Sequence, residues 1–224
     1  MLITGASGQL GTAVTHFFLN KGYKVIATLH KEEELKNWPS ETNFQTKVVN
    51  LSDSENAGLF VSQAISEHEH IDAALLLAGG FAMGGISETT IELVKKQIGI
   101  NFDTAYNIVQ PLFQHMVERN YGRIILIGSR PALNASYGKN MIAYSISKAM
   151  LVTLADLLNE TAKGSNVTVS VVAPGTIDTE VNRKSMPQAD TSNWVKPETL
   201  AEIFDFICSD SASVLKGTVL KAYG

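Results

Sequence analysis

The sequence predicts a single-domain α/β fold, built on a doubly wound, mainly parallel sheet of about seven strands. Short apolar segments alternate along the chain with segments of helical apolar spacing, a pattern typical of parallel strands joined by helices. A glycine-rich turn links the first apolar segment to the first helical one. Residues 72–78 are almost continuously apolar, as expected of a central strand covered on both faces. At 224 residues, the length suits one domain over residues 1–224.

The composition argues against several classes of protein. The net charge is −4 with scattered lysine and arginine residues, which is unlike a nucleic-acid-binding surface. There is no run of eighteen apolar residues and no secretory signal pattern, so we expect a cytoplasmic protein without a membrane partner. Cys208 is the only cysteine, which excludes a disulfide framework and a cysteine metal cluster. We expect it to pack in a helix.

The first element is an apolar strand at residues 1–3, followed by the turn Thr4–Gly11 and a helical pattern over residues 12–21. Glycines in such a turn permit positive φ angles and close approach of the backbone. The N-terminus of the following helix offers free N–H groups to a pyrophosphate. The predicted nucleotide contacts in this segment are Gly5, Ser7, Gly8, Gln9, Leu10 and Gly11.

The second strand, residues 24–29, bears on the choice of nucleotide. An acidic residue at the tip of this strand would bind the ribose hydroxyls of NAD, whereas basic residues there can pair with the 2′-phosphate of NADP. His30 and Lys31 follow the strand, and no acid stands at its tip. They favour NADP, with NAD still possible. The alternative is that Lys31 only begins a solvated helix face.

The remaining elements continue the alternation to the end of the chain. Asp53 is expected to cap the helix that follows it, and Pro111 to kink or weaken its helix. The predicted strands are residues 46–49, 72–78, 123–128, 166–173 and 217–220, and the predicted helices are residues 54–67, 87–120, 140–163 and 197–208.

Tyr144 and Lys148 stand four residues apart on a predicted helix, so they share one helix face. An unperturbed tyrosine titrates near pH ~10, and a cation within about 4–6 Å favours its anion. Lys148 is therefore expected to tune Tyr144 as a general acid. Ser129 ends the apolar run before this helix and points its hydroxyl at the same edge of the sheet. Tyr137 is a rival phenol without a lysine four residues later.

The glycine turn, Ser129 and the Tyr-x-x-x-Lys motif together resemble the short-chain dehydrogenase/reductase family, over essentially the whole chain. The resemblance implies a Rossmann-type domain that transfers a hydride between NAD(P)(H) and a small carbonyl or alcohol substrate, without a metal. It implies Tyr144 as acid/base, Ser129 as hydrogen-bond donor to the substrate oxygen, and Lys148 as the residue that holds the nicotinamide ribose. Asn101 would hold a water linked to the lysine and kink its helix. Many members form homodimers or homotetramers.

The resemblance also implies further cofactor contacts. Asn50 and Leu51 would contact the adenine, while the small residues Ala78, Gly79 and Gly80 would let the cofactor pass. After the sixth strand, Pro174, Gly175, the Ile177 backbone and Thr179 would meet the carboxamide and pyrophosphate. One departure lies in the turn, which reads T-G-x-x-G-x-x-G instead of the usual T-G-x-x-x-G-x-G, with Gln9 in place of a glycine.

Residues 178–194 are similar to the corresponding segment of dihydropteridine reductases, so we expect a substrate loop over about residues 178–197. An alternative is thus an enzyme that reduces a quinonoid dihydropterin. Those enzymes lack the serine and asparagine seen here as Ser129 and Asn101, and they carry an acid where His30 stands. A second alternative is an NADP(H)-binding sensor without turnover, against which the complete set Asn101, Ser129, Tyr144 and Lys148 argues.

Overall fold

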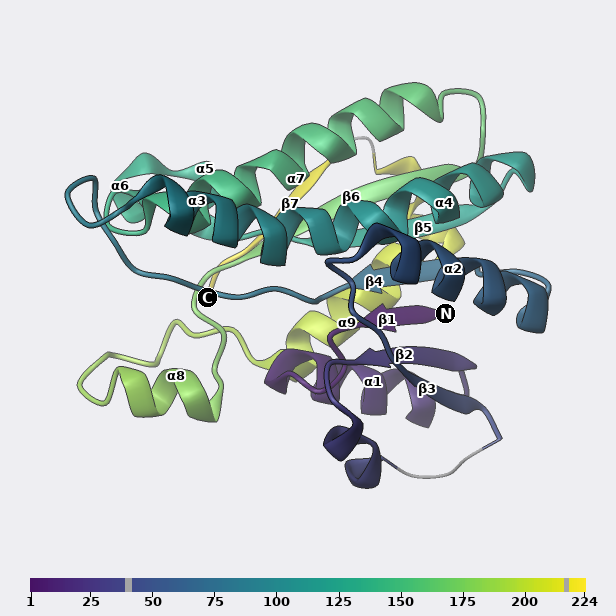
Figure 1. Ribbon diagram of the computed structural model, residues 1–224, viewed down its shortest axis with the longest axis horizontal. Helices are drawn as coiled ribbons and strands as arrows, with labels where there is room; N and C mark the ends of the chain where they lie inside the picture. The colour runs from purple at the N-terminus through teal and green to yellow at the C-terminus, as the bar shows by residue number, and fades with distance from the viewer. Residues whose placement is uncertain (39–41, 216–217) are drawn as a thin grey trace.

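In the computed structural model, residues 1–38, 42–215 and 218–224 are described, and they form an α/β fold around one sheet (Figure 1). The sheet has seven strands in the order β3-β2-β1-β4-β5-β6-β7, and every pair is parallel. This confirms the predicted fold class, with a sheet that is parallel throughout. The strands are β1 (Leu2–Thr4), β2 (Val25–Leu29), β3 (Phe44–Val48), β4 (Ala73–Leu76), β5 (Gly122–Ile127), β6 (Val167–Pro174) and β7 (Val219–Ala222).

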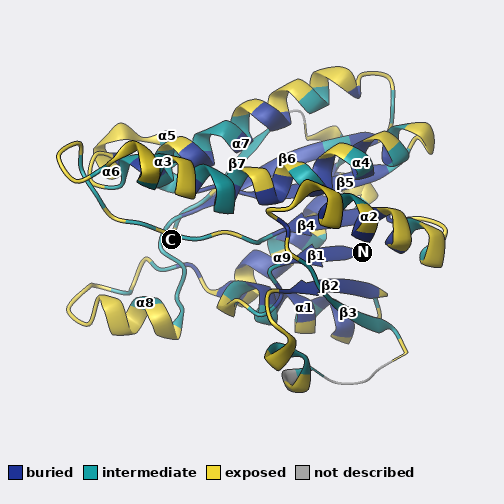
Figure 2. Ribbon diagram, in the orientation of Figure 1, coloured by how far each residue is buried: buried dark blue, intermediate teal, exposed yellow. Residues whose placement is uncertain are grey.

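Helices cover both faces of the sheet, and the central strands between them are buried (Figure 2). One face packs against α2 (Ser54–His68), α4 (Thr104–Glu118) and α7 (Ile142–Thr161). The other face packs against α1 (Gln9–Asn20) and α9 (Pro197–Cys208). Successive strand residues serve opposite faces, because side chains alternate along a strand: Leu2 lies in the first cluster and Ile3 in the second. This two-sided burial explains the continuous apolar runs.

The segment predicted as one helix over residues 87–120 is divided. Helix α3 (Ile91–Ile98) begins after Thr90, whose Oγ1 accepts a hydrogen bond from a backbone amide. A π-helical turn, η2 (Gly99–Asp103), then leads into α4. Helix α4 continues through Pro111, so the interruption occurs around Asn101 instead of at the proline. The buried neighbours Ile108 and Leu112 hold that turn in the core, which compensates for the missing N–H of the proline.

Shorter elements lie at the loops: η1 (Glu32–Asn37), α5 (Arg130–Leu133), α6 (Ala135–Gly138), α8 (Glu180–Ser185) and η3 (Asp210–Val214). The predicted start of the last strand, Gly217, lies outside the described residues, and β7 begins at Val219. Helix α1 begins at Gln9, three residues earlier than predicted. Of the helices in the described part of the chain, none is long and apolar enough to span a membrane.

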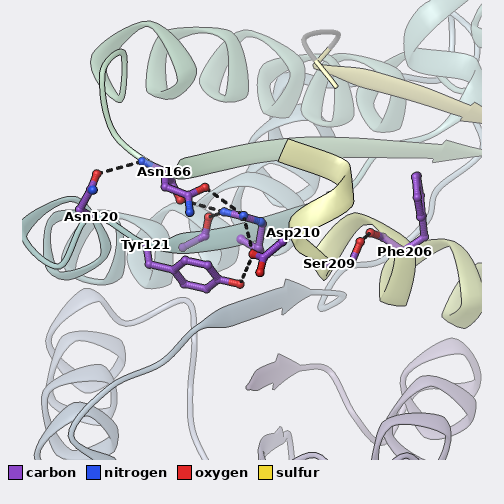
Figure 3. A network of polar contacts seen from close by, with 8 residues as sticks. Asn120, Tyr121, Asn166, Phe206, Ser209 and Asp210 are labelled. Carbon is purple, nitrogen blue, oxygen red and sulfur yellow. Dashed lines mark hydrogen bonds and ion pairs between the residues drawn. The ribbon is translucent and has the colours of Figure 1, made fainter. Parts of the chain in front are cut away.

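A network of polar side chains lies at the edge of the sheet where β5 starts (Figure 3). The Arg123 side chain is 1% exposed, and its guanidinium donates to the Gly122 carbonyl and to both the carbonyl and the Oδ1 of Asn166, at 2.8–3.0 Å. Asp210 lies 3.5 Å away, and the Tyr121 ring stacks on the cation. Since active clefts form at the opposite, carboxyl ends of parallel strands, this network is structural.

We expect Asn166→Ala to lower the free energy of unfolding by about 1–3 kcal/mol, because a buried guanidinium N–H loses its acceptor. Asp210→Asn is the matched control: the Asp210 side chain is 84% exposed, so its ion pair contributes less than about 1 kcal/mol. Urea unfolding of both variants measures the difference. A larger loss in Asp210→Asn would contradict this assignment of roles.

Candidate active site

The glycine turn is shaped by the strand next to it. Gly5 has φ +67°, in the region that favours glycine, and its amide donates to the buried Thr28 Oγ1 at 3.3 Å. A Cβ on Gly5 would lie 2.8 Å from the backbone N and Cα of Ala78. The turn can therefore approach the end of β4 only because residue 5 lacks a side chain.

The start of helix α1 follows directly from this turn. Gly8 is its N-cap residue, and the Thr12 amide donates to the Gly8 carbonyl at 2.7 Å. A Cβ on Gly11 would lie 2.1 Å from the Gly5 oxygen, so the turn folds tightly onto the helix. The first turn of α1 contains no acidic residue. Its free N–H groups are thus suited to a phosphate.

A cleft of about 410 Å³ opens beside the turn, at the carboxyl ends of β1 to β4. It brings together eight of the residues predicted to bind cofactor: Gly5, Ser7, Gly8, His30, Asn50, Leu51, Ala78 and Gly79. Sequence reasoning missed the rest of the wall, namely Thr28, Leu29, Val49, Ser52, Leu77, Ile100 and Thr104. Most of these are strand-end residues adjacent to predicted ones, whereas Ile100 and Thr104 reach the cleft through the π-helical turn.

The other predicted cofactor residues lie outside this wall: Gln9, Leu10, Gly11, Lys31, Gly80, Pro174, Gly175, Ile177, Thr179, Tyr144 and Lys148. Gln9 Oε1 accepts from the Val181 amide at 3.2 Å and so joins α1 to α8. Thr179 caps α8 through its hydroxyl. Pro174 ends β6, and the next residue, Gly175, donates its amide to the Ala222 carbonyl at 2.9 Å.

Asn101 is fully buried in the π-helical turn. Its Oδ1 accepts from the Gly80 amide at 3.0 Å, and its Nδ2 lies 2.9 Å from the Gly80 carbonyl, 3.1 Å from Gln97 Oε1 and 3.2 Å from Ser147 Oγ. The Asn101 side chain thus hydrogen-bonds both the N–H and the carbonyl of Gly80. These bonds satisfy the buried amide and fix the backbone that follows β4.

Gly79 lies between this amide and the lysine of the Tyr-x-x-x-Lys motif. A Cβ there would lie 2.5 Å from Asn101 Oδ1 and 3.3 Å from Lys148 Nζ. We expect Gly79→Ala to lower kcat/KM by about tenfold or more, since small displacements in a positioned site are costly. Gly58→Ala is the control, because the added Cβ would meet no other part of the described structure within 4 Å beyond its own stretch of α2. Steady-state kinetics of both variants test this prediction. A kcat/KM of Gly79→Ala equal to that of Gly58→Ala would contradict it.

Lys148 is buried on α7, one helical turn after Tyr144. Its Nζ donates to the Ile127 carbonyl, at the end of β5, with a distance of 2.8 Å. Burial lowers the pKa of Lys148 from 10.5 to about 7, because desolvation disfavours the charged ammonium. The amine is thereby placed near its titration point at neutral pH.

Tyr144 and Ser129 form a pair of hydroxyls at the same edge. Burial raises the pKa of Tyr144 above 10, and the Ser129 hydroxyl partly offsets that rise. The expected lowering by Lys148 is not found: desolvation dominates, and the ammonium itself is disfavoured. Ser129 Oγ is buried and lies close to the Tyr144 hydroxyl, but it forms no well-aligned hydrogen bond with another described residue. A free buried hydroxyl beside a phenol is what a substrate oxygen requires.

Two loops complete the surroundings of Tyr144. The Phe81 ring contacts the Tyr144 ring edge to face, with centroids 5.0 Å apart. The loop after Phe81 is held by Gly84, whose amide donates to the Asn140 carbonyl at 2.8 Å. The rival phenol, Tyr137, is 46% exposed and accepts a hydrogen bond from Arg130. These contacts favour Tyr144 over Tyr137 as the candidate acid.

The predicted substrate loop is pinned at its base. The Asp178 amide donates to the Val195 carbonyl, and the Val195 amide donates to the Thr176 carbonyl, both at 2.8 Å. Arg183 binds the Asp178 carboxylate with two nitrogens, at 2.5 and 2.8 Å, which keeps the pKa of that carboxyl below its usual value. Helix α8 therefore starts from a fixed base, and the Gln9–Val181 hydrogen bond ties it to the start of α1.

Comparison with known proteins gives a consistent result. The family model described as short chain dehydrogenase matches residues 1–190. An acetoacetyl-CoA reductase of Acinetobacter sp. (strain RA3849) is 27% identical, over 100% of this chain and 95% of the relative. A 3-oxoacyl-[acyl-carrier-protein] reductase of Thermotoga maritima (strain ATCC 43589 / DSM 3109 / JCM 10099 / NBRC 100826 / MSB8) is 25% identical, over 98% of this chain and 94% of the relative.

Solved structures share the fold. A structure described as "ElxO with NADP Bound" aligns with a TM-score of 0.90 and 22% identity, covering 98% of this chain and 95% of that one. The serine dehydrogenase of Escherichia coli aligns with a TM-score of 0.85 and 22% identity, covering 100% and 96%. Both cover nearly the whole chain, including the part that follows residue 190.

Proposed function

Because this chain belongs to the short-chain dehydrogenase family, we propose that it is an NAD(P)(H)-dependent oxidoreductase that reduces a carbonyl, or oxidises an alcohol, by hydride transfer. The observation that carries this proposal is the pair of hydroxyls at the carboxyl edge of the sheet. Ser129 Oγ is buried without a formed hydrogen bond among the described residues, and it lies close enough to Tyr144 to lower the pKa of that phenol. A buried amine, Lys148, stands one helical turn away.

When bound, the nicotinamide cofactor supplies or accepts the hydride. The Tyr144 hydroxyl gives a proton to the developing alkoxide, for which its raised pKa keeps it protonated at neutral pH. Ser129 Oγ donates a hydrogen bond to the same oxygen. Lys148, with a pKa of about 7, can return a proton to Tyr144 near neutral pH and hold the nicotinamide ribose. Asn101 positions Gly80 through its two hydrogen bonds, and its water relay remains a prediction.

The residues present fit the cofactor. Gly5 and Gly11 let the turn pack tightly against β4 and the start of α1, which leaves the α1 N-terminus beside the cleft as the place where the pyrophosphate would bind. Asn50 and Leu51 would hold the adenine at the other end of the cleft. The charge of Lys31 and the hydrogen-bonding ring of His30 favour NADP(H) over NAD(H), and a structural neighbour described with NADP supports that choice.

The experiment is cofactor oxidation by the native chain, with NADPH and NADH in parallel and a panel of carbonyl substrates. The panel contains acetoacetyl and 3-oxoacyl thioesters, after the relatives' names, and quinonoid dihydropterin. Carbonyl turnover supports the proposal. Turnover of the pterin alone would favour the dihydropteridine-reductase alternative, and cofactor binding without any turnover would favour the sensor; the named relatives favour neither.

The proposal includes a cytoplasmic, homodimeric or homotetrameric enzyme. Cytoplasmic action fits a protein that draws on reduced nicotinamide cofactors. Assembly is supported by large apolar side chains exposed on α4 and α7: Tyr106 is 43%, Ile146 44% and Leu157 62% exposed. Covering such side chains would stabilise an interface between copies.

A further inference from the structure

Glu34 lies on η1, five residues beyond the end of β2, and folds back over the tip of that strand. Its Oε2 accepts hydrogen bonds from the His30 amide at 3.0 Å and the Lys31 amide at 3.3 Å. The Ser7 hydroxyl, from the glycine turn, also interacts with this carboxylate. A single carboxylate therefore joins the strand tip to the turn.

This position is one end of the nucleotide cleft. Ser7 and His30 line the cleft, and both interact with the Glu34 carboxylate. In folds of this type, the residue at the tip of the second strand faces the adenosine ribose. Glu34 thus places a carboxylate at the tip of β2, where residue order alone suggests only the basic side chains of His30 and Lys31.

The carboxylate is charged at neutral pH. Partial burial acts to raise the pKa of Glu34, but hydrogen bonds from Ser7 and from the His30 and Lys31 backbone outweigh it, so the pKa lies below its usual value. A 2′-phosphate adds about two negative charges beside it, whereas a 2′-hydroxyl adds none and can donate a hydrogen bond to the carboxylate.

We propose that Glu34 is a specificity-determining residue that opposes the 2′-phosphate of NADP(H), so that the chain also uses NAD(H) despite the basic His30 and Lys31. This inference rests on the proposed function for its kinetic consequence, although its effect on nucleotide binding is independent of turnover. A 2′-phosphate beside this carboxylate would be repelled by its charge, whereas a 2′-hydroxyl there could donate a hydrogen bond to it.

A purely structural role is the competing explanation, because Glu34 also accepts from the N-cap residue of η1. Glu34→Gln separates the two roles. Glutamine keeps an acceptor oxygen for the backbone amides, as in a capping box, but removes the charge. Glu33→Gln is the matched control, since Glu33 is exposed on the same short helix and its replacement changes the net charge equally.

The test is isothermal titration of the native chain and both variants with NAD⁺ and NADP⁺, followed by kcat/KM for NADH and NADPH with one carbonyl substrate. We expect Glu34→Gln to tighten NADP⁺ binding by about tenfold, the size of one charge–charge interaction at a partly exposed site. NAD⁺ binding should stay within about threefold, and Glu33→Gln should change both by less than about twofold.

Two results would overturn the inference: an unchanged NADP⁺ to NAD⁺ affinity ratio in Glu34→Gln, or an equal change in Glu33→Gln. Equal weakening of both nucleotides in Glu34→Gln would assign the residue to the cap alone. Absence of turnover in every protein would count against the proposed function, while the titrations would still decide the role of Glu34.

Discussion

Tyr144→Phe is expected to lower kcat by about 10²–10⁴-fold, the usual contribution of a positioned general acid. The variant keeps the aromatic ring that contacts Phe81 and loses only the hydroxyl beside Ser129. Nucleotide affinity should stay within about threefold, because the cleft wall around the adenosine half does not include Tyr144. Steady-state kinetics and isothermal titration together measure the two effects.

Tyr137→Phe is the control for this experiment, since it removes a phenol from the neighbouring helix α6. Its hydroxyl accepts a hydrogen bond from Arg130, and no lysine stands four residues after it. We expect kcat within about threefold of the native value. If Tyr137→Phe lost activity while Tyr144→Phe kept it, the assignment of the acid would be reversed.

Lys148→Met is expected to lower kcat by about 100-fold or more and, at the same time, to stabilise the fold. The cost of burying the ammonium is removed, and a methionine of similar length fills the space. Since the Ile127 carbonyl loses its donor, the net gain in the free energy of unfolding should be about 2 kcal/mol at pH 7. Loss of activity together with a gain in stability is the result expected if Lys148 is kept for catalysis although its burial destabilises the fold.

The pH dependence of that gain follows from the sign of the shift. The pKa of Lys148 is about 7 in the folded chain, below its ordinary 10.5, so the unfolded chain binds the proton more tightly between these values. The folded native chain therefore gains stability as pH rises from 7 to 10.5. The advantage of Lys148→Met should be largest below pH 7 and shrink towards pH 10.5.

Urea unfolding at pH 6, 8 and 10 measures this, with Lys163→Met as the control. The Lys163 side chain, two residues after the end of α7, is 72% exposed, so its replacement should change stability by less than about 1 kcal/mol at every pH. If the native chain were more stable than Lys148→Met at pH 6, this would contradict a Lys148 pKa that is lowered by burial.

The sequence by itself predicted the fold class, the strands and most of the long helices, and it named candidate side chains for the site. Alternation of apolar segments is local information, and it records burial on both faces of a parallel sheet. The spacing of Tyr144 and Lys148 placed both on one helix face, and α7 has them there. The glycine turn predicted Gly5, Ser7 and Gly8 in the cleft wall.

Only the tertiary structure decided how these groups affect one another. The pKa of Tyr144 is raised instead of lowered, because desolvation by its packed surroundings is the largest effect on the phenol. The family resemblance implied an interrupted helix at Asn101, but not that its side chain would bind the Gly80 backbone from a π-helical turn. Three glutamates follow Lys31, and nothing in their order says that Glu34 folds back onto the strand tip. Such contacts depend on the relative placement of distant backbone segments, which residue order does not specify locally.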